Sequence, residues 1–149
     1  MFNRIRQAIR WDQQDLWHRV AASYFGGGSI VADLGCGHGG FLRYAPQATI
    51  GVDCGEDNLG VAGQYGRTLV MADVRALPFR DASLGGVHCS HVVEHMQPHD
   101  AHRLLCEADR VLRPGGVLVL QAPMMWRGFW DDLTHVRPYP PCAILEYLR

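Results

Sequence analysis

The sequence predicts an α/β fold, a three-layer sandwich in which helices cover both faces of a doubly wound, mostly parallel sheet. Three observations support this class. Short apolar runs rich in β-branched residues alternate with longer segments of helical pattern. The first run ends in a glycine-rich turn, as a buried parallel strand does when it passes into a helix. Glycine is frequent, 17 of 149 residues, which suits many such turns.

Five apolar runs are predicted as strands, because each is short and is bounded by glycine or polar residues. They span residues 30–34, 48–53, 67–71, 84–90 and 116–121. Helices are expected in the connections between them, a short one after the first strand and a long one before the fifth. Right-handed connections of this kind place consecutive strands parallel to one another.

The N-terminal segment, residues 2–25, has the periodicity of an amphipathic helix, and Gly26-Gly27-Gly28 ends it. Its apolar positions recur at steps of three and four residues: Phe2, Ile5, Ile9, Leu16, Val20 and Tyr24. We expect this face to pack on the sheet, over the ligand pocket or beside it.

The clearest internal helix spans residues 98–113. Pro98 suits its first turn, where a backbone N–H is not needed, and Arg113-Pro114-Gly115-Gly116 ends it. Residues 141–149 indicate the start of another helix. The apolar face of the 98–113 helix consists of Ala101, Leu104, Leu105, Ala108, Val111 and Leu112.

Composition excludes several classes of protein. Lys and Arg number 14 against 15 Asp and Glu, a net charge of −1, so no general basic surface favours a nucleic acid partner. No apolar run is long enough to cross a bilayer, and a membrane partner is not expected. The five cysteines are an odd number without C-x-x-C spacing, which indicates reduced thiols and a cytoplasmic location.

The turn at residues 31–40 predicts a cofactor site, because glycine permits positive φ angles and lets a ligand approach the backbone. Two interpretations fit it. Gly35, Gly37 and Gly40 have the dinucleotide-binding spacing, and Asp53 follows about 20 residues later, where a ribose-binding acid is expected. The turn can also be divided as Asp33-x-Gly35-x-Gly37-x-Gly39. A carboxylate at position 33 would repel a pyrophosphate, which counts against the dinucleotide interpretation.

In the second division the turn resembles motif I of the class I S-adenosylmethionine-dependent methyltransferases. Four further segments resemble later elements of that family, in the same order and over residues 29–123. They are Ile50-Gly51-Val52-Asp53, residues 72–79, the run from Gly86 through Met96, and Val111-Leu112-Arg113-Pro114-Gly115-Gly116. The resemblance implies a strand order of 3-2-1-4-5, S-adenosylmethionine as cofactor and S-adenosylhomocysteine as product.

The resemblance also implies which residues meet the cofactor. Asp33 would face its methionine part, Asp53 would accept from the ribose hydroxyls, and Asp73 would accept from the adenine amino group. The full set of expected cofactor-binding residues is Asp33, Gly35, Cys36, Gly37, Gly39, Asp53, Cys54, Asp73, Val74 and Ser90.

The sequence departs from the family at its C-terminal end, where a complete domain has two further strands in an antiparallel hairpin. Only about 28 residues follow the fifth predicted strand. We therefore expect a single domain over residues 1–149 that lacks the hairpin and is truncated. Its parts are an N-terminal helix (1–28), a cofactor-binding core (29–123) and an acceptor-side loop and helix (124–149).

Two segments are expected to face the methyl acceptor. Methyl transfer depends mainly on alignment, so no fixed catalytic triad is expected. The first segment follows the fourth strand and holds His91 and His95; the second, residues 124–139, holds His135, the first choice for a general base. The expected acceptor-binding residues are Trp126, Trp130, Asp131, Arg137 and Tyr139. For both segments a purely structural role stays open.

The run from His91 to His95 also matches H-x-x-E-H, the inverted zinc-protease motif. Two histidines four residues apart can share a metal, but a catalytic zinc needs a third protein ligand, and the sequence does not identify one. The resemblance to the methyltransferases accounts for Glu94 and His95 without a metal. We therefore expect no metal site.

The sequence thus predicts a methyltransferase that moves a methyl group to an oxygen or nitrogen of a small molecule or saccharide. The alternatives are an NAD-dependent oxidoreductase and a module that binds the nucleotide cofactor without turnover. A homodimer is left open.

Overall fold

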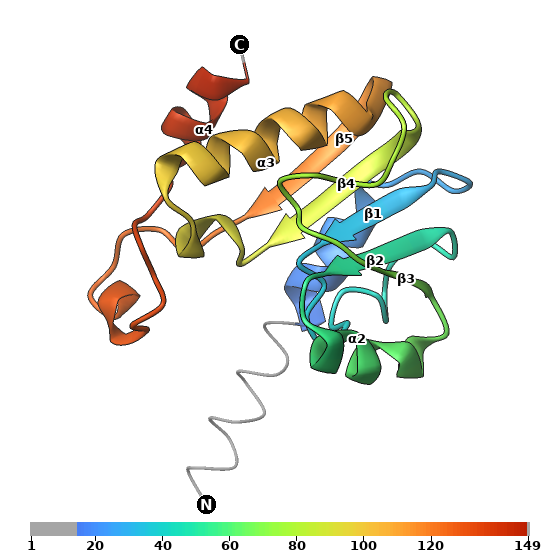
Figure 1. Cartoon of the computed structure of the whole chain (residues 1–149), viewed down its shortest axis with the longest axis horizontal. Coiled ribbons are helices and arrows are strands. Elements are labelled where there is room, and N and C mark those ends of the chain that lie inside the picture. The colour runs from blue at the N-terminus through green and yellow to red at the C-terminus, as the bar shows by residue number, and fades with distance from the viewer. Residues whose placement is uncertain (1–14, 149) are drawn as a thin grey trace, which may run out of the picture.

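The computed structural model describes residues 15–148, and its centre is one sheet of five parallel strands in the order β3-β2-β1-β4-β5 (Figure 1). The predicted fold class and strand order are confirmed. The strands lie within one residue of the predicted bounds except β5, which begins four residues earlier. They are β1 (Val31–Leu34), β2 (Thr49–Asp53), β3 (Thr68–Met71), β4 (Leu84–Ser90) and β5 (Leu112–Gln121).

The register of the central strands decides which side chains share a face. Asp33 of β1 lies beside Gly51 of β2 and His88 of β4. Since side chains alternate along a strand, Val31 and Asp33 point to one face of the sheet, and Ala32 and Leu34 to the other. A charged residue in the buried central strand therefore lies directly beside an imidazole on its neighbour.

The face of Ala32 and Leu34 is covered by α3 (Pro98–Val111) and bordered by α4 (Pro141–Tyr147) (Figure 1). Pro98 stands in the first turn of α3, as predicted. The predicted apolar face is confirmed, because five of its six residues are buried: Ala101, Leu104, Leu105, Ala108 and Val111. The sixth, Leu112, already belongs to β5, where Gly115 with φ 76° lies in an irregular stretch between the pairings at Leu84 and Gly86.

The opposite face, that of Val31 and Asp33, is covered by the helical residues 15–23 and by α2 (Glu56–Ala62). The predicted orientation of the N-terminal helix is wrong for its described part. Ala21 and Phe25 are buried, whereas Leu16 and Tyr24 are 57% and 62% exposed. Phe25 fixes this orientation, since its ring packs edge-on against Phe41 with 6.1 Å between centroids. The positions of Phe2, Ile5 and Ile9 lie outside the described residues.

The segment after β1 also differs from the prediction, because residues 37–44 form turns instead of a regular helix. The Arg67 guanidinium donates to the backbone carbonyls of Leu42, Ala45 and Gln47, at 3.3, 3.1 and 3.0 Å. These carbonyls are therefore satisfied by a side chain from the β3 edge of the sheet, and Pro46 has no N–H to continue a helix.

Three short 3₁₀ turns complete the fold: η1 (Gly63–Tyr65), η2 (Val93–His95) and η3 (Phe129–Asp131). The helix predicted from residue 141 is confirmed as α4. Within residues 15–148 no helix has both the length and the apolar character needed to cross a membrane.

We predict that Leu104→Ala lowers the free energy of unfolding by about 2–5 kcal/mol, because Leu104 is fully buried between α3 and the sheet. Urea denaturation measures the change. The neighbouring exposed position provides the control: Arg103→Ala should stay within about 0.5 kcal/mol of the unaltered protein. Equal losses in the two variants would contradict the packing of α3 described above.

Candidate active site

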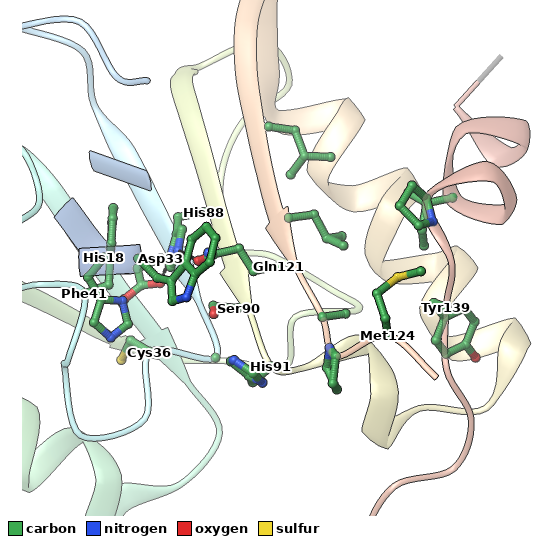
Figure 2. A pocket seen from close by; sticks show the side chains of 18 of the residues that line it. His18, Asp33, Cys36, Phe41, His88, Ser90, His91, Gln121, Met124 and Tyr139 are labelled. Carbon is green, nitrogen blue, oxygen red and sulfur yellow. Dashed lines mark hydrogen bonds and ion pairs between the residues drawn. The ribbon is translucent and has the colours of Figure 1, made fainter. Parts of the chain in front are cut away.

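A cavity of about 1020 Å³ opens at the carboxyl ends of β1, β4 and β5. Asp33, Cys36, Phe41 and His18 lie on one side of it, and Met124 and Tyr139 lie on the other (Figure 2). Ser90 and His91, at the end of β4, lie between them. This is the edge of the sheet where an open α/β fold binds its ligands.

Asp33 forms a buried pair with His88 at the floor of this cavity. Asp33 Oδ1 lies 2.6 Å from His88 Nδ1, and both side chains are at most 3% exposed. His88 Nε2 lies 3.3 Å from Gln121 Oε1, and the His88 ring stacks on Phe41 with 3.7 Å between centroids. Asp33 Oδ2 is buried and has no hydrogen-bond partner within the described part of the chain. One acceptor oxygen is thus available to a ligand in the cavity.

The glycine-rich turn bends beside Asp33. Gly35, Gly37 and Gly39 have φ angles of 69°, 52° and 83°, so all three need the freedom predicted from the sequence. The N–H groups of Gly35 and Cys36 both donate to the Val52 carbonyl, at 2.8 and 2.9 Å. Those two N–H groups hold the turn against β2. Gly35 and Cys36 line the cavity, whereas Gly37 and Gly39 do not.

Burial governs the chemistry of the thiol in this turn. Cys36 is 7% exposed, and desolvation, reinforced by the negative charges of Asp33 and Asp53, raises its pKa to about 12. Cys36 is therefore a neutral thiol at physiological pH, and it contributes shape to the cavity.

Asp53 ends β2 as predicted, but its carboxylate already accepts from the chain itself. Oδ2 accepts from the Gly37 N–H at 2.9 Å, and Oδ1 accepts from the Gly55 N–H and the Asn58 amide at 2.8 and 3.0 Å. These bonds join the glycine-rich turn to the end of β2. The predicted contact of Asp53 with a ribose stays a prediction, and Asp53 does not line the cavity.

Asp73 follows β3 and is paired with Arg75. The guanidinium donates to both carboxylate oxygens, at 2.6–3.1 Å, and also reaches Asp100 of α3 at 2.8 Å. These bonds lower the pKa of Asp73, whose side chain is 45% exposed. Asp73 does not line the cavity. Two further predicted cofactor residues also lie away from it: Cys54, which follows β2, is exposed, and Val74 is buried in the core under α3.

Of the predicted catalytic histidines, His91 borders the cavity. It follows β4 with a φ of 56°, which is unusual for a residue with a side chain. Its Nδ1 lies 3.1 Å from Glu94 Oε1, and this hydrogen bond raises the pKa of His91. The buried Glu94 carboxylate therefore orients His91 and favours its protonated form.

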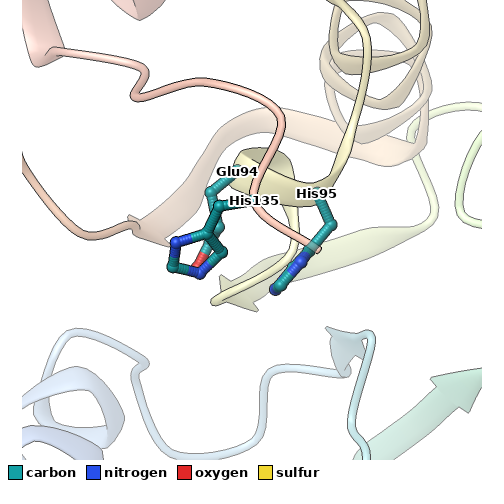
Figure 3. Close-up of side chains that lie close together, drawn as sticks. All are labelled: Glu94, His95 and His135. Carbon is teal, nitrogen blue, oxygen red and sulfur yellow. The ribbon is translucent and has the colours of Figure 1, made fainter. Parts of the chain in front are cut away.

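His95 and His135 lie together beside the cavity but do not line it, and Glu94, from the same turn as His95, lies close to both (Figure 3). His95 belongs to η2 and His135 to the loop after β5, and their ring centroids are 4.9 Å apart. The Val136 N–H donates to the Glu94 carbonyl at 2.7 Å, which holds the loop against η2.

Of the five predicted acceptor-binding residues, Tyr139 alone lines the cavity. Its hydroxyl donates to the Met96 carbonyl at 2.9 Å, and the Arg137 guanidinium lies over its ring, 5.3 Å from the ring centroid. The other four, Trp126, Trp130, Asp131 and Arg137, are exposed on the loop outside the cavity.

Several residues that line the cavity escaped the sequence prediction, among them His18, Phe41, His88 and Gln121. A signal for His88 was present, because a histidine within an apolar run of a central strand needs a polar partner. Its partner becomes evident only from the register between β1 and β4.

Comparison with known proteins decides the family. The model of the methyltransferase domain family matches residues 32–120 of the chain. The chain belongs to the class I S-adenosylmethionine-dependent methyltransferases. Membership in this family implies S-adenosylmethionine as the cofactor.

The family relatives differ in what they are named for. A probable tRNA methyltransferase 9B from Mus musculus is 35% identical over 95 residues, 62% of this chain and 21% of its own length. The phthiotriol/phenolphthiotriol dimycocerosates methyltransferase of Mycobacterium tuberculosis is 33% identical over 114 residues, 68% of this chain and 40% of its own. This chain therefore spans less than half of either relative.

One solved structure matches nearly the whole chain. A SAM dependent methyltransferase from Archaeoglobus fulgidus has 28% identity and a TM-score of 0.82, over 99% of this chain and 73% of that one. The fold of this methyltransferase family member thus matches that structure over nearly the whole length of the chain.

We predict that Gly39→Ala is more destabilising than Gly37→Ala by about 1–3 kcal/mol, measured by urea denaturation. Both positions have positive φ, so both variants carry backbone strain. A Cβ at Gly39 would lie 2.8 Å from the Tyr65 ring and 3.2 Å from Ala62 Cα, whereas a Cβ at Gly37 would meet nothing within 4 Å. Equal stability of the two variants would contradict this packing.

We predict that alkylation of the native protein near pH 8 with iodoacetamide separates the cysteines into two groups. Cys54, Cys106 and Cys142 are exposed and should react, whereas the buried Cys36 and Cys89, whose thiol pKa values burial raises, should not. Peptide mass spectrometry measures each site. In urea all five should react, and fast labelling of Cys36 in the folded protein would contradict the assignment.

Proposed function

We propose that the protein transfers a methyl group from S-adenosylmethionine to an oxygen or nitrogen of a small molecule that brings apolar surface into the cavity. The single observation that carries the proposal is the buried, unpartnered Oδ2 of Asp33 in the wall of the cavity. A buried carboxylate oxygen without a donor is costly, and the α-ammonium group of S-adenosylmethionine is a charged donor that would satisfy it.

The cofactor residues fit S-adenosylmethionine best at its methionine end. Asp33, Gly35, Cys36 and Ser90 border one cavity, and they are the ones we assign to that end. When bound, the cofactor supplies a methyl group on a positive sulfur that is already activated for displacement. Asp53 would meet the ribose through acceptor positions left beside its bonds to Gly37 and Gly55. Asp73 would meet the adenine only if Arg75 exchanged one of its bonds.

The lining of the cavity supports an acceptor with an apolar part. Leu118 and Leu120 of β5 and Ile144, Leu145 and Leu148 of the α4 segment border it. Pockets with apolar walls and a few convergent polar groups are typical of small-molecule sites. A saccharide would offer this lining mainly hydroxyl groups, so we place it second.

His91 is our candidate for the residue that faces the acceptor, because it is the predicted catalytic histidine that borders the cavity. Its hydrogen bond to Glu94 favours the protonated ring, which donates a hydrogen bond more readily than it removes a proton. In this proposal His91 positions the acceptor. His95 and His135 lie outside the cavity. A homodimer is left open.

We predict that the purified chain binds S-adenosylmethionine and S-adenosylhomocysteine in calorimetric titration and does not bind NAD. Asp33→Asn should weaken binding of both ligands roughly 10- to 100-fold, the loss expected for one hydrogen bond to a charged group. Asp109→Asn, which alters an exposed acid on α3, is the matched control and should bind normally. A thermal melt of each variant checks that it is folded.

Tight binding of NAD, or full affinity in a folded Asp33→Asn variant, would overturn the proposed cofactor site. Transfer of a labelled methyl group to a panel of apolar phenols and alcohols, saccharides and tRNA then tests the acceptor class. Labelling of tRNA alone would replace the small-molecule acceptor, and one relative is named for that substrate. Binding without any transfer would favour a non-catalytic module.

A further inference from the structure

We propose that Glu94, His95 and His135 form a binding site for a divalent transition-metal ion of the zinc type. Each residue offers one ligand atom, and the three atoms lie within 4.8 Å of one another. The three side chains converge from η2 and from the loop after β5 (Figure 3). The sequence motif pairs His91 with His95 and identifies no third ligand, whereas the fold brings His95 together with Glu94 and His135.

The Glu94 carboxylate points to a cation independently of this clustering. Glu94 is fully buried, and its Oε1 lies 3.1 Å from His91 Nδ1. Its Oε2 is buried without a hydrogen-bond partner in residues 15–148. A buried carboxylate oxygen left without a donor costs free energy, and a metal ion bound there would remove that cost.

Both imidazoles are oriented as metal ligands usually are. His135 Nδ1 lies 2.6 Å from the Phe129 carbonyl, and His95 Nδ1 lies 3.2 Å from the Thr134 carbonyl. A carbonyl only accepts, so Nδ1 carries the proton in each ring and Nε2 presents its lone pair. A backbone carbonyl on the second ring nitrogen is the usual outer-shell partner of a metal-bound histidine. Asp132 Oδ2, 3.7 Å from His135 Nε2, adds negative charge beside the site.

The ligand types select the ion. Two imidazole nitrogens and one carboxylate oxygen suit zinc, cobalt or nickel, whereas magnesium and calcium prefer oxygen ligands alone. Ligand atoms around a tetrahedral zinc lie about 3.4 Å apart, given bond lengths near 2.1 Å. The three atoms would close to that spacing by side-chain rotation, which the exposed His95 permits. Three protein ligands leave a fourth position open.

An ion at this location would connect two elements of the fold. It would join the loop after β5 to η2, and through the other oxygen of Glu94 it would be coupled to His91 at the cavity wall. Binding of the ion requires neither S-adenosylmethionine nor an acceptor, so this site and the proposed activity can each fail without the other.

We predict that the metal-free protein binds one cobalt(II) ion with the visible absorption of a four-coordinate site, and that zinc displaces it. His135→Gln and His95→Gln should each weaken zinc binding at least about tenfold, measured by competition with a chromophoric chelator. Zinc should also raise the melting temperature of the unaltered protein and not that of the variants. His135→Gln leaves the buried Glu94 in place, so a folding failure at Glu94 does not obscure the result.

The control addresses a second pair that could take up zinc on the surface. His102 Nε2 and Cys106 Sγ of α3 lie 3.6 Å apart, and Cys106 is exposed. Cys106→Ser should leave the cobalt spectrum and the zinc affinity unchanged. Loss of binding in Cys106→Ser, or unchanged affinity in the His95→Gln His135→Gln double variant, would overturn the proposed site. Absence of any binding to the unaltered protein would overturn it as well.

Discussion

The hydrogen bond between Asp33 and His88 is the interaction on which the arrangement of the site depends. It joins β1 to β4, the two strands between which the sheet reverses its strand order, and it lies where their carboxyl ends open into the cavity. A buried carboxylate needs donors, and a buried imidazole needs an acceptor, so each side chain fixes the other. The Phe41 ring, from the turn after β1, stacks on His88 and so packs this turn against the Asp33–His88 pair. One oxygen of Asp33 is satisfied by the fold and the other is left for a ligand.

The sequence sufficed for those features that depend on local pattern. The five strands, α3 with its buried face, and the positive φ angles of the glycine-rich turn all follow from periodicity and from the special conformations of glycine and proline. Tertiary contacts decided the rest. The turns after β1 end where the Arg67 guanidinium satisfies the carbonyls of Leu42, Ala45 and Gln47, a contact across 20–25 residues that local pattern does not show. Residues 15–25 face the sheet through Ala21 and Phe25, and Phe25 fits against Phe41 and Gly86, whereas Leu16 and Tyr24 stay exposed. No periodicity contains that information.

The same limit explains the site residues. Acids near strand ends can be located from sequence: Asp33 is the last but one residue of β1, Asp53 ends β2, and Asp73 lies two residues after β3. The hydrogen-bond donors of each carboxylate cannot be predicted from the sequence, because they come from other parts of the fold. Asp53 holds the glycine-rich turn through the Gly37 N–H, and Asp73 holds the loop after β3 to α3 through Arg75 and Asp100. Two of the three acids thus act in the folding of the site. Bonds within the fold already occupy most of their acceptor positions, which favours Asp33 as the strongest anchor.

Glu94 raises the corresponding question on the far side of the cavity. A fully buried carboxylate is stable only with compensating donors or charge, and His91 compensates one of its oxygens. His91 is itself 68% exposed in its side chain, so solvent screens its charge and weakens that compensation. The segment nevertheless keeps the acid buried and closes the His135 loop over it through the Val136 N–H. A cation held by Glu94, His95 and His135 would place a positive charge beside this carboxylate and would compensate the oxygen that has no hydrogen-bond partner among residues 15–148.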